Sequence, residues 1–364
     1  MNQTTSPQGP PPRITQRRIA ELAGVSQATV SLVLNGKADA LTRIPEATRQ
    51  RVMEVIRETT YVADPAARRL AGASNRIIGV FTYEPAFPNA SLDFYAALLT
   101  GIESRSEELG CDLLLFTSAP VVDGTRSLFH EKNRLRLADG CLLLGREMDG
   151  GELARLLASG FPFVAVGRRE TPGVPYVAAD YVSGTAELVR RAWAAGHRRF
   201  AYLHEPSTGE SVLDRIRGLR DELQRLSGAA DVHPLRATDG SDLEADWAAV
   251  RAADPTVLFV ESPAHALTLA GFAARDGIRV PDDLSMVVLA DPSRTPQLGP
   301  DFTRLSPPRI RLGAEAISLL TRILDPADLV RDDELRVTLP CAITDGATLV
   351  APRPAERSIA GGTA

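Results

Sequence analysis

The apolar residues between Ile19 and Asn35 recur at helical spacing, with one short interruption near the middle. In the first half, Ile19, Leu22 and Ala23 fall three and four positions apart, which predicts one apolar stripe on a short helix. Gly24 follows this stripe, and glycine readily adopts the left-handed backbone conformation that ends many helices. The pattern therefore predicts a short helix that stops at Gly24.

A second helix is predicted directly after this turn. Ser26 can cap its first turn through the side-chain hydroxyl, and Val30, Val33 and Leu34 form its inward stripe. The residues left on the outward face are uncharged and mostly small: Gln27, Ala28, Ser31 and Leu32. A helix, a tight turn and a second helix are typical of a DNA-reading motif, although a helical hairpin that merely packs has the same pattern.

A third helix is predicted to begin at Pro45, because proline is favoured at the first helical position. Val52, Val55 and Ile56 give this helix an apolar stripe, to which Tyr61 can add at the end. Three short helices with facing stripes can close one small core, so the front of the chain is expected to form a separate mini-domain.

The segment from Ala66 to Ala73 follows a break at Asp64-Pro65 and reads AARRLAGA. Its eight residues are too few for a stable isolated helix, so its order is expected to depend on DNA or on a second subunit. Leu70, flanked by Arg68 and Arg69, has the chemistry of a wedge that enters the minor groove while the arginines hold phosphates. A plain linker with a chance leucine is the alternative.

From Ile77 onward the pattern changes to short apolar runs separated by helix-length amphipathic stretches. Such alternation predicts parallel sheets with helices on both faces. The expected strands are 77–83, 111–117, 140–145, 161–167, 198–203, 256–260 and 284–290. The expected helices are 94–109, a polar one after Thr117, one after Gly145, 182–196, 212–226 and 264–275.

The pattern of strands and helices restarts after Asp180, which predicts two similar α/β units in tandem. Ligands bind beyond the carboxyl ends of parallel strands, so a cleft is expected where the two units face each other. The loops expected to line it follow Thr82, Thr117, Gly145, Gly167, Leu203, Val260 and Ala290.

Charge is distributed unevenly along the chain. The whole sequence carries 41 Lys and Arg against 46 Asp and Glu. Between Arg13 and Arg76, however, eleven basic residues stand against six acidic ones. A basic front segment suits contacts with phosphates, whereas the acidic remainder is repelled by DNA.

The sequence does not predict a membrane protein, a secreted protein or an enzyme. Neither a signal peptide nor an apolar run of about eighteen residues is found, so a cytoplasmic protein without membrane contact is expected. The expected buried thiols of a reducing compartment are Cys111, Cys141 and Cys341. The histidines are scattered, with His197 expected at the surface or as a cap. No GxSxG elbow, P-loop or metal-ligand spacing is present, so no catalytic residue, cofactor or metal is assigned.

Beyond these patterns, the sequence resembles the lactose-repressor/galactose-repressor family of bacterial transcription regulators from Ile14 to about Val350. The segments that carry the resemblance are IAELAGVSQATVSLVLNG, PEATRQRVMEVI, YVADPAARRLAGASNRIIGV, LLTGIESRSEELGCDLLL, DRIRGLRDEL, AGHRRFAYL, GIRVPDDLSMVVLAD and TRLSPP. They occur in the family's order and spacing. The resemblance implies an N-terminal all-α helix-turn-helix headpiece and a periplasmic-binding-protein-like α/β effector domain made of two doubly wound parallel-sheet lobes.

The expected domain limits combine the pattern with the resemblance. They are a disordered arm at 1–12, a helix-turn-helix domain at 13–63, a hinge helix at 64–76, a ligand-binding and dimerisation domain at 77–350, and a disordered tail at 351–364. The first lobe is expected at about 77–178 and 306–322, and the second at about 179–304 and 337–350.

The resemblance implies a homodimer, or in some members a tetramer, whose headpieces read a pseudo-palindromic operator. Gln27 and Ala28 lie at base-reading positions, and many members carry arginine at Leu32, so the guanine contact of that arginine is absent here. Leu70 matches the family's hinge leucine, whereas Ala71 stands where some members carry a base-contacting lysine. The residues expected to contact DNA are Thr15, Ser26, Gln27, Ala28, Thr29, Ser31, Leu32, Asn35, Arg68, Leu70 and Ala71.

The family's effector pocket is only partly kept. Arg215 matches an arginine that often grips a sugar hydroxyl or carboxylate, although a structural salt bridge is the alternative. Ser262-Pro263 replaces a usual Asn-Asp pair, and Ala290 replaces the first residue of an Asp-Asp pair. The expected ligand contacts are Phe94, Tyr95, Arg215, Ser262, Ala290 and Asp291. The small-molecule effector is then a sugar held differently, a non-sugar metabolite, or one with little control over the protein.

Two other readings stay open beside the ligand-controlled repressor. A two-lobed solute-binding protein without DNA function shares the α/β architecture, but the basic front segment and the missing signal peptide argue against it. A regulator with little or no small-molecule control is the other.

Overall fold

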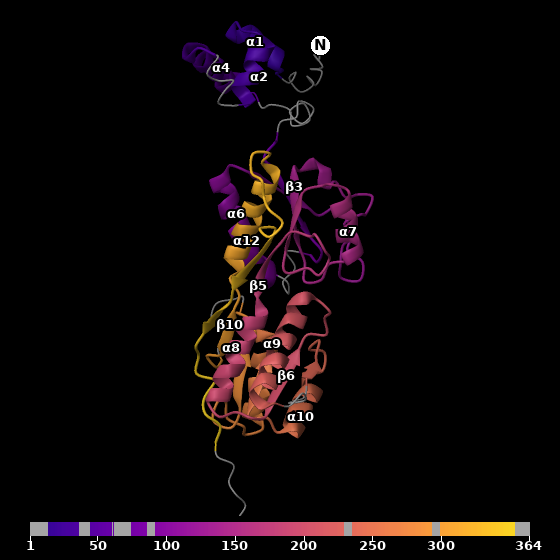
Figure 1. The fold of residues 1–364 in the computed structure, drawn as a ribbon, viewed down its shortest axis with the longest axis vertical. Helices are drawn as coiled ribbons and strands as arrows, with labels where there is room; N and C mark the ends of the chain where they lie inside the picture. Colours follow the sequence, from indigo (N-terminus) through magenta and orange to yellow (C-terminus); the bar gives the residue numbers. More distant parts are fainter. Residues whose placement is uncertain are drawn as a thin grey trace, which may run out of the picture. The chain divides into compact units, whose positions relative to one another are not determined.

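The computed structural model describes residues 14–35, 44–59, 61, 74–85, 92–228, 235–292 and 299–353. Contacts divide the chain into two units, Met1–Asn75 and Arg76–Ala364, whose ribbons are drawn in Figure 1. Several expectations fall outside the described residues: the arm at 1–12, the hinge region over 62–73 with Arg68, Leu70 and Ala71, and the tail at 354–364.

The described part of the first unit contains the helices α1 (Gln16–Ala23), α2 (Gln27–Asn35) and α4 (Glu46–Thr59). Its core consists of Ile19, Ala20, Ala23, Val30, Val33, Ile44 and Val52. The expectation that Leu22 belongs to this core is wrong, because this residue is 48% exposed and Ala20 is buried instead. The reason is that α1 packs against both α2 and α4, which turns the face with Ile19 and Ala20 inward.

Side-chain caps and one glycine decide where these helices begin and turn. Thr15 caps α1 and Ser26 caps α2, each accepting a hydrogen bond from the backbone N–H three residues further on, at 3.3 and 3.1 Å. Gly24 has a φ of 64°, a left-handed conformation that favours glycine. Arg51 Nε donates a 2.8 Å hydrogen bond to the Ala23 carbonyl, which holds α4 against the end of α1.

The first lobe of the second unit is built on a six-stranded sheet in the order β11-β5-β4-β3-β1-β2, in which every pair is parallel. Its strands are β1 (Ile77–Thr82), β2 (Asp112–Phe116), β3 (Gly140–Leu144), β4 (Phe163–Val166), β5 (Tyr176–Asp180) and β11 (Arg336–Pro340). Its helices are α6 (Leu92–Leu109), α7 (Gly150–Ala158) and α12 (Arg309–Leu324), and Figure 1 shows α6 beside α12. Ile78 and Val80 of β1 join the core under α6 and α12, whereas Phe81 joins the core under α7.

The second lobe contains a six-stranded sheet in the order β12-β10-β9-β8-β6-β7, with β12 antiparallel to β10 and the other pairs parallel. Its strands are β6 (Phe200–His204), β7 (Leu235–Ala237), β8 (Val257–Val260), β9 (Ser285–Val288), β10 (Thr303–Ser306) and β12 (Ala342–Thr344). Helices α8 (Tyr181–Ala194) and α9 (Glu210–Ser227) cover one face, and α10 (Leu243–Ala253) and α11 (Pro263–Arg275) cover the other.

In the described part of the chain, three connections cross between the lobes: Asp180 to Tyr181, Ser306 to Arg309, and Pro340 to Ala342. From the sequence, we expect the chain to re-enter the second lobe at about residue 337. This expectation is wrong, because β11 (Arg336–Pro340) pairs in parallel with β5 of the first sheet. The chain re-enters the second lobe only at β12. The partner of an edge strand is distant in sequence, so local periodicity carries no signal for it.

The expected polar helix after Thr117 is also wrong. Within the described residues, 118–134 contain turns and one isolated bridge between Val122 and Thr125, followed by the short 3-10 helix η1 (Leu135–Leu137). Gly124 adopts a φ of 82°, and such a left-handed residue ends a right-handed helix.

The thiols and one histidine also differ from expectation. Cys141 is buried, but Cys111 and Cys341 are only half-buried, and all three are free. Burial raises the pKa of Cys341 to about 12, so this thiol stays protonated at neutral pH. His197, expected at the surface or as a cap, is buried between the Thr256 hydroxyl at 3.0 Å and the Val350 carbonyl at 2.7 Å.

None of the described helices combines the length and the apolar character that crossing a bilayer requires.

Candidate functional site

The outward face of α2 is presented as the sequence predicts. Gln27 and Ala28 are exposed, and the Leu32 residue is 42% exposed. Thr29 and Ser31 are half-buried at the edges of this face. The face therefore offers a partner one amide, two flanking hydroxyls and otherwise small or apolar groups.

The capping residues place helix N-termini next to this face. Thr15 and Ser26 precede α1 and α2, and Ser26 Oγ also lies 2.9 Å from Thr29 Oγ1. Their hydroxyls are thus engaged within the headpiece, while the helix N-termini they cap are suited to phosphate. Asn35 ends α2, and its side chain lies outside the described residues. Contacts of these residues with DNA stay a prediction.

Arginines of α1 and α4 pair with nearby glutamates at the surface of the headpiece. The exposed Arg17 and Arg18 share Glu21 at 3.5 and 3.1 Å, and the half-buried Arg49 pairs with Glu46. Exposed pairs of this kind contribute about 0–1 kcal/mol, so a phosphate can replace the glutamate as partner at little cost. This arrangement supports the expected phosphate contacts of the headpiece.

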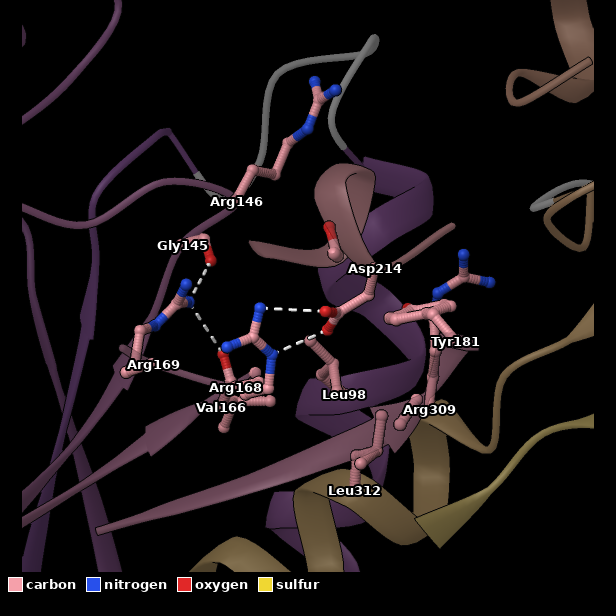
Figure 2. Close-up of a pocket in the computed structure, with 13 residues that line it drawn as sticks. Leu98, Gly145, Arg146, Val166, Arg168, Arg169, Tyr181, Asp214, Arg309 and Leu312 are labelled. Atoms are coloured by element: carbon pink, nitrogen blue, oxygen red, sulfur yellow. Dashed lines mark hydrogen bonds and ion pairs between the residues drawn. The ribbon is translucent and has the colours of Figure 1, made fainter. Parts of the chain in front are cut away.

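A second candidate site lies between the two lobes of the second unit. A cavity of about 40 Å³ is lined by Leu98, Gly145, Arg146, Val166, Gly167, Arg168, Arg169, Ala179, Tyr181, Ser211, Asp214, Arg309 and Leu312 (Figure 2). The loops expected after Gly145 and Gly167 contribute to it. In its described shape the cavity has room for a few water molecules or one small polar group.

Arg168 and Asp214 form a two-pronged ion pair across this cavity. Arg168 follows β4 in the first lobe, and Asp214 lies on α9 in the second. The Arg168 Nε to Asp214 Oδ2 and Nη2 to Oδ1 distances are both 2.8 Å (Figure 2). The hydrogen bonds to Asp214 raise the pKa of Arg168 above its ordinary value. This pair holds the two lobes together at the cavity.

Two further arginines of the first lobe bind acids of the second. Arg169 Nη1 donates a 2.6 Å hydrogen bond to Glu210 Oε2, and Arg146 pairs with Glu205. Figure 2 shows Arg146 extending away from the Arg168–Asp214 pair. The charges across the cleft are therefore complementary, with basic side chains on one lobe and acidic partners on the other.

A wider groove of about 750 Å³ opens beside the cavity and is lined by several carboxylates. Glu152 accepts a hydrogen bond from the Leu128 N–H at 3.0 Å, and Asp149 caps α7 at 2.7 Å. Glu147 accepts one from the Thr208 N–H at 3.0 Å. These carboxylates support the local backbone, so their number alone does not mark a ligand site.

Arg215 does not line the cavity. It is 5% exposed and donates hydrogen bonds of 3.0 Å to Glu261 and 3.2 Å to the Leu289 carbonyl. Its guanidinium also lies 3.8 Å from the centre of the Tyr181 ring. Burial raises the pKa of Glu261, and the charge of Arg215 opposes that rise. Arg215 therefore forms a structural salt bridge with Glu261, which is the alternative that the sequence left open for it. The side chain of Phe94 lies outside the described residues.

The other expected ligand residues also lie away from the cavity lining. Tyr95 is buried in the core under α6 and α12, and Ser262 caps α11. Ala290 is buried, and Asp291 accepts a 3.0 Å hydrogen bond from Arg304 Nε. Ligand contact by these residues stays a prediction that the described geometry does not favour.

Four arginines that do line the cavity are not among the ligand residues expected from the sequence: Arg146, Arg168, Arg169 and Arg309. A signal for three of them existed, because Arg146 follows β3, and Arg168 and Arg169 follow β4, at the carboxyl ends where ligands bind. Arg309 begins α12 directly after a crossing between the lobes, and only the structure brings it to the cavity.

Comparisons with known proteins agree with this two-part organisation. Residues 16–64 match the family model described as bacterial regulatory proteins, lacI family, and residues 189–349 match the model of a periplasmic binding protein-like domain. The HTH-type transcriptional regulator CelR of Thermobifida fusca is 28% identical over 345 residues, which cover 89% of this chain and 97% of that protein. Catabolite control protein A of Priestia megaterium is 26% identical over 325 residues, covering 86% and 93%.

Solved structures share the fold. The Lac repressor dimer bound to operator and the anti-inducer ONPF matches with a TM-score of 0.71 and 21% identity, over 93% of this chain and 100% of that chain. The complex of the transcriptional regulator CelR with cellobiose matches with a TM-score of 0.61 and 25% identity, over 92% and 100%. The chain thus joins a lacI-family helix-turn-helix segment at 16–64 to a periplasmic-binding-protein-like domain, the organisation of the bacterial transcriptional regulators that it matches over most of their length.

Proposed function

We propose that this regulator is a cytoplasmic homodimeric repressor whose two headpieces read a pseudo-palindromic operator, under the control of a small molecule in the interlobe cavity. The observation that carries the proposal is the exposed, uncharged face of α2 in a headpiece whose described helices α1, α2 and α4 share one core. The relatives matched over most of their length are regulators, and no catalytic step is part of the proposal.

Base reading is assigned to the exposed face of α2. Gln27 can donate and accept a hydrogen bond at the edge of adenine, which distinguishes base pairs in the major groove. Ala28 and Leu32 offer apolar contact, for example to a thymine methyl group. Thr29 and Ser31 at the edges of the face are assigned to phosphates.

Part of the discrimination is assigned to the hinge. Leu70 is proposed to wedge into the central minor-groove step, with Arg68 on a phosphate and no lysine-type base contact from Ala71. Bending the operator at that step depends on its sequence, so the hinge adds specificity at bases that α2 does not touch. A dimer supplies two such hinges at the centre of a symmetric site.

Ligand control is proposed to act through the ion pairs between the lobes. Arg168 with Asp214 and Arg169 with Glu210 join the lobes, so a ligand that exchanges or reinforces these contacts changes the lobe geometry. A change that favours one dimer geometry alters operator affinity, and operator binding then alters ligand affinity by the same factor. The complex of CelR with cellobiose supports a small molecule as the type of ligand.

Deletion of residues 1–75 tests the proposed division of labour. Arg76 is kept because its carbonyl accepts a 2.8 Å hydrogen bond from the Asp112 N–H at the start of β2. We expect the full chain to shift its own upstream DNA in a gel, and the truncated chain to remain a folded dimer that does not. A truncated chain that still shifts this DNA contradicts the proposal. A full chain that binds small molecules but no upstream DNA would favour a solute-binding protein instead.

A further inference from the structure

The charges around the interlobe cavity do not balance. Four arginines and one carboxylate line it. Three of these arginines have a carboxylate partner: Arg146 with Glu205, Arg168 with Asp214, and Arg169 with Glu210. Arg309 forms no ion pair with any residue of the described ranges. One positive charge at the cavity is therefore left without a counter-charge in the described structure.

The helix that carries Arg309 adds to this positive potential. Arg309 is the first residue of α12, whose N-terminus has no side-chain cap and no acidic residue in its first turn. A helix N-terminus carries a positive partial charge. Leu312, one turn further along α12, also lines the cavity, and Figure 2 shows both side chains on this helix. The Arg309 guanidinium and the positive end of α12 thus both lie at this cavity.

Two guanidinium nitrogens at the cavity lack a hydrogen-bond acceptor among the described residues. They are the buried Nε atoms of Arg169 and Arg309. Arg169 itself is 5% exposed, and its Nη atoms already bind Glu210 and the Gly145 carbonyl. A buried donor without an acceptor is unfavourable, and a ligand oxygen at this position would satisfy it.

We propose that the effector carries an anionic oxygen group, a carboxylate or a phosphate, that binds Arg309 at the positive end of α12. The inference rests on the proposed ligand control of the cavity and specifies the chemical class of the ligand. A volume of about 40 Å³ admits such a group, and the rest of the ligand occupies space made when Arg168 and Asp214 separate. Arginine suits both groups because its planar donors match carboxylate and phosphate oxygens.

A neutral sugar fits this arrangement less well. Its hydroxyls could accept from the arginines, but they would find few acceptors for their own protons, because the acids around the cavity are already bound by arginines: Glu205, Glu210 and Asp214. Asp291 is likewise held by Arg304 Nε at 3.0 Å and the Ser306 hydroxyl at 2.6 Å. A neutral ligand would also leave the charge of Arg309 uncompensated.

The test compares charged and neutral probes of the same skeleton on the full chain at constant ionic strength. The first set is glucose, gluconate and glucose 6-phosphate, and the second is glycerol, glycerate and glycerol 3-phosphate, with inorganic phosphate and citrate added. A ligand that binds only the folded state raises the melting temperature, and titration calorimetry then gives its Kd. We expect at least one anion to bind and its neutral counterpart not to. The two anions of each set separate carboxylate from phosphate recognition.

Variants connect the binding to Arg309. We expect Arg309→Gln to weaken the Kd of the bound anion about tenfold or more, as for the loss of a hydrogen bond to a charged group. Arg309→Lys keeps the charge and should lose less. Arg311→Gln, an exposed arginine of the same helix that does not line the cavity, is the matched control and should leave the Kd within about twofold.

Three outcomes would overturn the inference: a neutral probe that binds as tightly as its anion, an Arg309→Gln variant with unchanged Kd and unchanged unfolding, or a panel in which no anion binds. Operator binding by the same preparation, measured without probes, tests the proposed function separately from the inference about the ligand. A chain that shifts operator DNA but binds neutral probes alone keeps the proposed function and loses the inference. A chain that shifts no DNA loses the proposed function, whatever the probes do.

Discussion

Arg168 and Asp214 face each other across the two lobes, joined by two hydrogen bonds of 2.8 Å although they lie 46 residues apart in the chain. The side chain of Asp214 is 7% exposed, so its negative charge depends on Arg168 for compensation. Breaking one partner of a buried pair leaves an uncompensated charge, which is far costlier than losing an exposed pair. This pair is therefore the contact at which closure of the lobes can be tested most directly.

Arg168→Gln should lower the free energy of unfolding by about 3 kcal/mol, the lower end of the range for a buried pair, because Arg168 is partly exposed. Urea unfolding measures this change, and small-angle scattering should show a larger radius as the lobes separate. Arg217→Gln is the control on α9, since Arg217 pairs at 3.5 Å with Asp221 and both are well exposed. That variant should cost less than about 1 kcal/mol. Equal losses for the two variants would contradict a closing role for Arg168.

Leu32→Arg should change the operator base that the headpiece prefers, rather than simply tighten its binding. Arginine can bind guanine through two hydrogen bonds worth about 1–3 kcal/mol of discrimination, whereas leucine offers only apolar contact. Selection from a randomised operator library measures the preference. Met53→Arg on α4 adds the same charge at another exposed position and should leave the preferred sequence unaltered. An unchanged base preference in Leu32→Arg would contradict base reading by α2 at position 32.

Ser26→Ala should loosen the first turn of α2, because the hydroxyl accepts the Thr29 N–H hydrogen bond at 3.1 Å. Loss of such a cap costs about 1 kcal/mol, which should appear as faster hydrogen exchange in α2 and up to about fivefold weaker operator binding. Ser26→Asn keeps a capping side chain and should restore most of both properties. If the two variants lose operator affinity equally while exchange in α2 is unchanged, the hydroxyl acts on DNA and not as a cap.

The stability of the second unit should fall as the pH drops below about 6.5. Burial lowers the pKa of His197 below its ordinary value of 6.5, so the unfolded chain binds a proton more readily than the folded one. The stabilisation is therefore present above the unfolded pKa and is lost as the pH falls through the folded pKa. Burial lowers the pKa of His204 and His265 as well, with the same sign.

Urea unfolding at several pH values between about 5 and 8 measures this dependence. His197→Gln should make it shallower, because one of the three histidines with a lowered pKa is gone, whatever the variant does to stability at neutral pH. His130→Gln, at a half-buried position in the loop after β2, is the control and should keep the dependence of the parent. A pH dependence that is unchanged in His197→Gln would assign the effect to other groups.

Most features of the headpiece follow from residues that are close together in the sequence. The helices α1 and α2, the turn at Gly24 and the cap at Ser26 are present as predicted, and α4 begins at Glu46, one residue after the predicted start at Pro45. Each of these features depends on residues no more than four positions apart. Leu22 departs from prediction because its environment is set by two other helices at once. Periodicity identifies an apolar face but not which edge of that face the neighbours cover.

The second unit shows the same limit on a larger scale. The apolar runs at β1, β3, β4, β6, β8 and β9 predict buried strands, since each is apolar along most of its length. The short strands β7 and β12 and the edge strand β11 have no such run, and their place depends on distant partners. The allocation of β11 to the first lobe is therefore a property of the assembled sheet.

The sequence by itself determined the helices of the headpiece, the exposed face of α2, the buried strands β1, β3, β4, β6, β8 and β9, and the two-lobed class of the fold. Only the tertiary structure decided that Arg215 is buried against Glu261 and that Arg168, Arg169 and Arg309 line one cavity. The physical reason is distance along the chain. Helix caps and apolar stripes are made by near neighbours, whereas an ion pair or a cavity is made by residues that meet only after the lobes have folded and closed.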